Sequence, residues 1–239
     1  VGGYPEMLMR ESASRRNAWA TAYVKAIVER DVKDISSIEK LVEMPHLLEI
    51  LAHQSGNLTN FTQIGGQLNL DTKTAQKYVG LLETLFLVKR LRPWHGNRLS
   101  RMVKTPKIHF LDSGLLACLN RTTLSVIEAD RSRAGALLET WVYGELLKSI
   151  TVAAEPWDIF HYRDKDQVEV DFVLENNERR IIGIEVKASS TVTLQDFRGL
   201  KKLAAFSGKA WISGIVLYSG TQCLSFAEGL WAIPLSLLD

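Results

Sequence analysis

Hydrophobic residues recur at helical spacing near the start of the chain. Between residues 14 and 43, the side chains of Trp19, Tyr23 and Ile27 follow one another at intervals of four. Residues four apart lie on one face of a helix, so this spacing predicts a helical segment. Pro45 ends the segment, because proline cannot continue a helix from within.

Three short helices are expected after this segment. The first, "HLLEILAHQSG", stops at Gly56; Asn60 can cap the second, over "FTQIGGQLN"; Asp71 or Thr72 can cap the third. The third helix has one apolar stripe, formed by Ala75, Tyr78, Val79, Leu82 and Leu85. Its other face carries Lys73, Gln76, Lys77 and Gly80.

The pattern then changes to two strands, "LFLVKRLRPW" and "RMVKTPKIHFLD", around the loop "HGNRLS". Three helices followed by a two-stranded ribbon is the order of a winged helix-turn-helix, which we place at residues 44–120. Its third helix would present Lys73, Gln76 and Lys77 to a major groove. The wing carries three cations that would contact phosphates: Arg98, Arg101 and Lys104. Winged helices also act purely as protein-docking modules, and that alternative stays open.

A second domain is expected at residues 131–239. A strong amphipathic helix, "AGALLETWVYGELLKSI", precedes three strand-like runs, "DIFHYRD", "QVEVDFVLE" and "RRIIGIEVKAS". A helix that ends at Gly208 and two further strands complete an α-β-β-β-α-β-β order. The chain is therefore expected to have a mixed α/β fold.

Positive charge gathers in one part of the chain. The net charge is only +2, yet residues 1–120 hold 16 Lys and Arg against 11 Asp and Glu. Between residues 73 and 107, nine basic residues stand against one acid, Glu83. Such a block on a small domain favours a polyanionic partner, here DNA. A solvated basic face without a partner is the alternative.

Acidic residues and one lysine form the candidate for catalysis. Glu185 and Lys187 stand two apart on a strand and therefore share a face. If "NNER" joins the second and third strands as a hairpin, Asp171 can lie beside Glu185. Two close carboxylates repel unless a cation lies between them, and oxygen ligands suit Mg²⁺ or Mn²⁺. Glu139, on the preceding helix, could supply a third carboxylate.

These residues resemble the motif of the PD-(D/E)XK nuclease-like superfamily. Asp171 in "EVDFV" and Glu185 with Lys187 in "IEVKAS" match its core, and Glu139 in "GALLETWV" matches the helix acid of many members. The resemblance implies a restriction-endonuclease-like αβββαβ domain. It also implies catalysis by all four residues, with the three acids as metal ligands.

A wider resemblance covers nearly the whole chain. The segments "GGYPE", "ERDVKDI", "LLETLFLVKRLRPW", "RMVKTPKIHFLDSGLLACL" and "HYRDKDQVEVDFVLE" look like the uncharacterised region that follows an AAA+ ATPase module in many prokaryotic ATP-binding proteins. Residues 1–43 would then be a helical remnant that joins the missing ATPase module. No G-x-x-x-x-G-K-[ST] loop is present, so we expect ATP to bind only to that missing N-terminal part.

Three functional hypotheses remain. The chain is a nucleic-acid-binding module with an inactive nuclease-like domain, an active Mg²⁺-dependent endonuclease or exonuclease, or a protein-docking or oligomerisation module. An exposed Trp94 would favour the last, and a homo-oligomer stays open. No apolar run is long enough for a membrane helix, and two distant cysteines are typical of a reduced, cytoplasmic protein. Scattered histidines exclude a Ser-His-Asp or zinc site.

Overall fold

The structure is a computed structural model that describes residues 2–32, 41–94 and 105–238. The chain divides into two compact units. The first contains residues 1–90 and 107–141, and the second contains residues 91–106 and 142–239. Each has its own hydrophobic core. In the described ranges, no helix combines the length and apolar character needed to cross a membrane.

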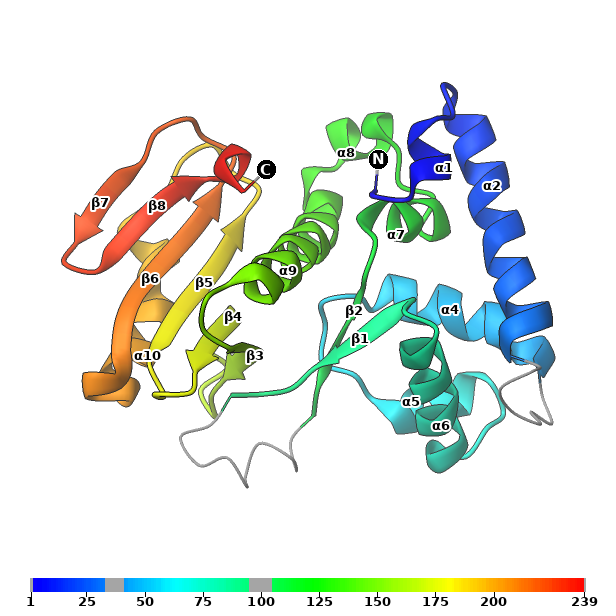
Figure 1. The fold of residues 1–239 in the computed structure, drawn as a ribbon, viewed down its shortest axis with the longest axis horizontal. Helices are drawn as coiled ribbons and strands as arrows, with labels where there is room; N and C mark the ends of the chain where they lie inside the picture. The colour runs from blue at the N-terminus through cyan, green and yellow to red at the C-terminus, as the bar shows by residue number, and fades with distance from the viewer. Residues whose placement is uncertain (1, 33–40, 95–104, 239) are drawn as a thin grey trace. The chain divides into compact units, whose positions relative to one another are not determined.

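The first unit is mainly helical (Figure 1). Its helices and strands are α1 (Pro5–Leu8), α2 (Ala13–Ala26), η1 (Ile27–Val32), η2 (Leu41–Glu43), α4 (Met44–His53), α5 (Phe61–Gln67), α6 (Thr72–Thr84), β1 (Val88–Leu91), β2 (Lys107–Phe110), α7 (Ser113–Leu119), α8 (Leu124–Ala129), η4 (Arg131–Arg133) and the start of α9 (Ala134–Val152). The helix expected over residues 14–43 is confirmed as far as Ala26, after which a π-helical turn continues to Val32. The rest of that expected helix includes residues 33–40, which lie outside the described ranges.

Local capping explains why α5 and α6 form. The side chain of Asn60 accepts a hydrogen bond from the backbone N–H of Gln63 at 3.1 Å. Asp71 Oδ1 accepts bonds from the backbone N–H groups of Lys73 at 2.8 Å and Thr74 at 3.0 Å. Each cap satisfies donors that the first helical turn leaves unpaired. Both expected caps are confirmed, and so is the buried stripe of α6, which contains Ala75, Tyr78, Val79 and Leu82.

The turn between α5 and α6 depends on a close backbone approach. The N–H of Leu70 donates to the carbonyl oxygen of Gly65 at 2.8 Å. A Cβ atom on Gly65 would lie 2.6 Å from the carbonyl oxygen of Leu70, which is nearer than real Cβ atoms come. Asn69 has a φ of 51° in this turn, a left-handed conformation that asparagine tolerates better than most residues. These two residues therefore allow α6 to follow α5 closely.

The expected ribbon is present as a two-stranded sheet of β1 and β2. The loop between these strands includes Arg98, Arg101 and Lys104, which lie outside the described residues. Their role in a wing therefore stays a prediction.

The second unit is a six-stranded mixed sheet with helices on both faces (Figure 1). Its elements are the rest of α9, then β3 (Trp157–Arg163), β4 (Glu169–Asn176), β5 (Ile181–Lys187), η5 (Leu194–Phe197), α10 (Arg198–Ser207), η6 (Gly208–Ala210), β6 (Trp211–Tyr218), β7 (Leu224–Ala227), β8 (Leu230–Pro234) and η7 (Leu235–Leu237). The spatial order is β3-β4-β5-β6-β8-β7. β3, β4 and β5 pair antiparallel, and β6 continues parallel to β5.

The two faces of this sheet are covered by different helices. Leu200 and Leu203 of α10 are fully buried and pack with Val173 and Val216 in one core. On the other face, the ring of Tyr143 from α9 stacks on Phe172, with ring centroids 5.8 Å apart. The predicted α-β-β-β-α-β-β order is thus confirmed, except for β7, whose short "LSFA" run the sequence analysis did not recognise as a strand.

Trp94 is buried, so the exposed tryptophan that would favour a docking module is not found at this position. Its side chain is only 3% exposed and belongs to the core of the second unit. The backbone N–H of Trp94 donates to the carbonyl oxygen of His161 at 2.6 Å, and the N–H of His161 donates to that of Arg92 at 3.0 Å. The chain after β1 therefore extends along β3, and an argument for docking cannot rest on this tryptophan.

Candidate functional site

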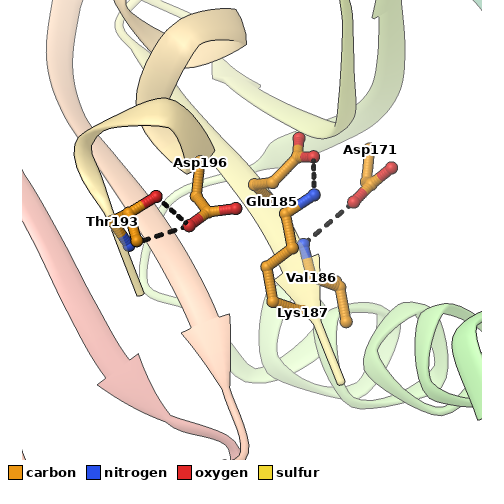
Figure 2. Close-up of polar contacts among 6 residues, drawn as sticks. All are labelled: Asp171, Glu185, Val186, Lys187, Thr193 and Asp196. Carbon is orange, nitrogen blue, oxygen red and sulfur yellow. Dashed lines mark hydrogen bonds and ion pairs between the residues drawn. The ribbon is translucent and has the colours of Figure 1, made fainter. Parts of the chain in front are cut away.

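Asp171, Glu185 and Lys187 come together on two adjacent strands. β4 and β5 pair so that Phe172 lies opposite Ile184, which places Asp171 and Glu185 one residue further along. The carboxylate Oδ2 of Asp171 accepts a hydrogen bond from the backbone N–H of Val186 at 2.9 Å (Figure 2). That bond fixes the Asp171 side chain against β5, at the residue between Glu185 and Lys187.

Lys187 provides the positive charge of this cluster. Its Nζ lies 2.8 Å from Glu185 Oε1, and the two side chains are 33% and 15% exposed (Figure 2). Burial lowers the pKa of Lys187, but the charges of Glu185, Asp171 and Asp196 and the hydrogen bond to Glu185 together raise that pKa above its usual value. Lys187 is therefore a fixed cation at neutral pH and is not suited to act as a general base.

Asp196 is a further acid near this lysine that the sequence analysis missed. Its carboxylate accepts hydrogen bonds from the backbone N–H of Thr193 at 2.8 Å and from the Thr193 hydroxyl at 3.0 Å (Figure 2). The two residues form a capping box at the start of η5. A signal was available in the sequence, because Thr193-x-x-Asp196 comes two residues after "VKASS" and marks the start of a helix.

Glu139 lies in the first unit, whereas Asp171, Glu185 and Asp196 lie in the second. Its Oε2 atom is next to Gly56, where an added Cβ would be only 2.9 Å away. Within the described ranges, no three His, Cys, Asp or Glu side chains are arranged to hold a metal ion. Mg²⁺ can bind through one or two carboxylates while it keeps its waters, so Asp171 and Glu185 fit a minimal site of that kind. The predicted contribution of Glu139 stays a prediction.

The predicted recognition helix presents its polar face to solvent. Lys73, Gln76 and Lys77 are all exposed on α6. Arg90 of β1 braces this helix, because its guanidinium donates to the carbonyl oxygen of Gln76 at 2.7 Å and pairs with Glu83 at 3.1 Å. Arg90 therefore fixes α6 to β1, while the basic residues on the exposed face of α6 remain accessible.

Other members of the basic block are used inside the protein. Arg90 is engaged as described, and Lys107 is only 3% exposed within β2. Arg92, by contrast, is exposed, although its guanidinium carbon lies 5.7 Å from the centroid of the Phe160 ring. Counting charges along the sequence therefore overstated how much of this block can meet a partner. Lys73, Lys77 and Lys89 are the exposed lysines of the block that the described ranges contain.

Comparison with known protein families divides the chain into two parts. Residues 1–125 match the family described as "Domain of unknown function (DUF8612)". Residues 134–238 match "Domain of unknown function (DUF4143)", a domain that accompanies AAA-type ATPase domains. The second part of the chain is thereby similar to a domain that is found together with AAA-type ATPase domains.

Two similar proteins of known sequence are described as uncharacterised. Proteins of Mycobacterium bovis and Mycobacterium tuberculosis are each 26% identical over 233 residues, which is 98% of this chain. The chain spans about half the length of these curated relatives, because the match covers 51% of each.

Among solved structures, a Thermococcus gammatolerans assembly of McrB AAA+ hexamers with bound McrC is similar at 12% identity. The likeness covers 79% of this chain and 46% of that one, with a TM-score of 0.32. A likeness this low supports no conclusion about fold or function.

Proposed function

The chain belongs to the DUF8612 family, and we propose that it is the nucleic-acid-binding part of an AAA+ ATP-binding protein. In this proposal, residues 44–120 form a winged helix-turn-helix that binds DNA through α6. A preceding ATPase module, outside this chain, binds ATP. The second unit has the αβββαβ order of restriction-endonuclease-like domains.

The geometry of α5 and α6 carries the proposal. A short helix, a tight turn and a second helix are joined so closely that Gly65 has no room for a side chain. The second helix buries one stripe and exposes Lys73, Gln76 and Lys77 near its N-terminus. In helix-turn-helix proteins, the N-terminal residues of the second helix contact base edges and phosphates. The two strands that follow α6 in the chain, β1 and β2, pair with each other, and this order supports the assignment of a wing.

The chemistry of this surface suits a nucleic acid. Lysine ammonium groups neutralise phosphates, and the amide of Gln76 can donate to and accept from a base edge. The positive end of the α6 dipole adds to their charge. The carboxylate of Asp71 caps the helix by accepting two backbone hydrogen bonds and one from the Thr74 hydroxyl, and its negative charge offsets part of this dipole effect.

A double substitution of Lys73 and Lys77 by Ala is expected to weaken duplex DNA binding. Each lysine that neutralises a phosphate contributes about one unit to the slope of log affinity against log salt. The variant should therefore lose about two units of that slope. Fluorescence anisotropy with a labelled duplex, measured at several salt concentrations, provides the slope for each protein.

The matched control replaces Lys148 and Lys165 by Ala. Both lysines are exposed on the second unit, and their loss removes the same charge. The control should bind duplex with the parent slope. Equal slopes for both variants would show that α6 is not the binding surface.

A second candidate function is metal-dependent cleavage of a phosphodiester in the second unit. It is favoured by the contact of Asp171 with the Val186 N–H, which fixes a carboxylate beside Glu185 and Lys187. Asp171 and Glu185 would hold Mg²⁺ or Mn²⁺, which when bound polarises a phosphoryl oxygen and lowers the pKa of a coordinated water. Lys187, held protonated by its acidic neighbours, would stabilise negative charge on the phosphate.

A further inference from the structure

One segment of the second unit carries positive charge without any acid. From residue 142 to 239, ten Lys and Arg stand against thirteen Asp and Glu. The segment 197–210, which contains α10, holds four of those cations and no acid. The rest of the unit is therefore strongly acidic, and α10 stands out as its basic element.

Most of the α10 cations face solvent. Arg198 and Lys201 of α10 are exposed, as is Lys209 of the following η6, while Leu200 and Leu203 on the opposite side of α10 are buried in the core. Lys202 is used differently, because its Nζ lies 2.6 Å from a carboxylate oxygen of both Asp164 and Asp166. These two ion pairs attach α10 to the turn after β3. The exposed cations Arg198, Lys201 and Lys209 can therefore bind a partner.

An exposed aromatic ring accompanies these cations. Phe206, at the end of α10, is 61% exposed. Its ring meets the buried Trp94 edge-on, with centroids 5.7 Å apart. Trp94 supports the ring from below, so one surface of Phe206 remains available for stacking. Phe206 follows Arg198 by eight residues, which is about 12 Å along the helix axis. This distance equals the length of several nucleotides at about 3.4 Å each.

The start of α10 is fixed beside the strand that carries Asp171. A Cβ atom on Gly199 would lie 2.2 Å from the carbonyl oxygen of Glu169, two residues before Asp171. Only glycine allows the helix to come this close to β4. The basic surface of α10 therefore begins next to the Asp171, Glu185 and Lys187 cluster.

We propose that Arg198, Lys201, Phe206 and Lys209 form a binding surface for single-stranded nucleic acid. The three cations contact the phosphates, and Phe206 stacks on a base, as aromatic residues do in single-strand-binding proteins. Charge complementarity selects a polyanion, and the exposed ring selects one with unstacked bases. The inference rests on the proposed function as a nucleic-acid-binding protein, and it assigns a second strand-binding surface to the unit that carries the cluster.

Two variants of the full chain test this surface with a labelled dT20 oligonucleotide. Arg198→Gln/Lys201→Gln/Lys209→Gln is expected to reduce the salt slope for dT20 by about two units, at about 0.7 per phosphate contact. Phe206→Leu retains apolar volume without the aromatic face, and it should weaken dT20 binding about fivefold or more. Lys148→Gln/Lys165→Gln/Arg179→Gln is the charge-matched control, because it removes three exposed cations elsewhere on the second unit. Circular dichroism checks that each variant is folded.

The results separate this inference from the proposed function. Parent-like dT20 binding by both α10 variants would overturn the inference, while duplex binding that depends on Lys73 and Lys77 would still support the proposed function. Displacement of dT20 by poly-glutamate at equal charge would also overturn the inference. The surface would then recognise negative charge but not unstacked bases. Failure of the parent to bind either nucleic acid would overturn both.

Discussion

Replacing Trp94 by Ala is expected to lower the free energy of unfolding of the second unit by about 3–5 kcal/mol, as for other large core aromatics. The indole is 3% exposed and packs against Tyr162 and Phe206, with centroids 6.2 and 5.7 Å away. Its loss would leave a cavity at the edge of the core. Hydrogen exchange of the slowest amides in β4 and β5 measures this free energy within the second unit.

Trp231→Ala is the matched control for that experiment. Trp231 lies in the same sheet but is 44% exposed. Its removal should cost about 1 kcal/mol or less. Equal losses for the two variants would contradict the assignment of residues 91–94 to the core of the second unit. A single melting temperature is not sufficient here, because two units need not unfold together.

Cleavage by the cluster, the second candidate function, predicts that Asp171→Ala and Lys187→Ala each slow the reaction at least about 100-fold. The Asp171→Ala variant would lack a metal ligand, and the Lys187→Ala variant would lack the cation that faces the phosphate. The assay uses plasmid and single-stranded DNA with Mg²⁺ or Mn²⁺. Omission of the divalent ion should abolish cleavage by the parent.

Asp158→Ala and Lys148→Ala are the controls, since each removes an equivalent charge from an exposed position in the same unit. Both should cleave like the parent. If the parent binds DNA but cleaves neither substrate, the second candidate fails and the cluster is an ion pair that stabilises β5. Cleavage that survives in Asp171→Ala would place the reaction elsewhere.

Elements with a regular pattern could be predicted from the sequence. The caps of α5 and α6 and the apolar stripe of α6 follow from residue type and spacing alone, as does the end of α10 at Gly208. The hairpin of β4 and β5 followed from a polar turn between two apolar runs. Because strand residues alternate, that hairpin was enough to place Asp171 near Glu185 and Lys187.

Features that depend on tertiary contacts could not be predicted. Trp94 follows a proline at the end of a predicted strand, next to the predicted loop, and only its pairing with β3 makes it a core residue. Arg90 and Lys107 count as free charges in the sequence, although one braces α6 and the other is buried in β2. The strand β7 is four residues long with mostly exposed side chains, so it shows no alternation to recognise.

The salt dependence of duplex binding tests the central claim most directly. The account predicts that the parent chain binds a DNA duplex with an affinity that falls steeply with salt, with a log–log slope of about −2 or steeper. About two units of that slope should come from Lys73 and Lys77. Absence of duplex binding, or binding that does not change with salt, would contradict the account and move the function to protein docking.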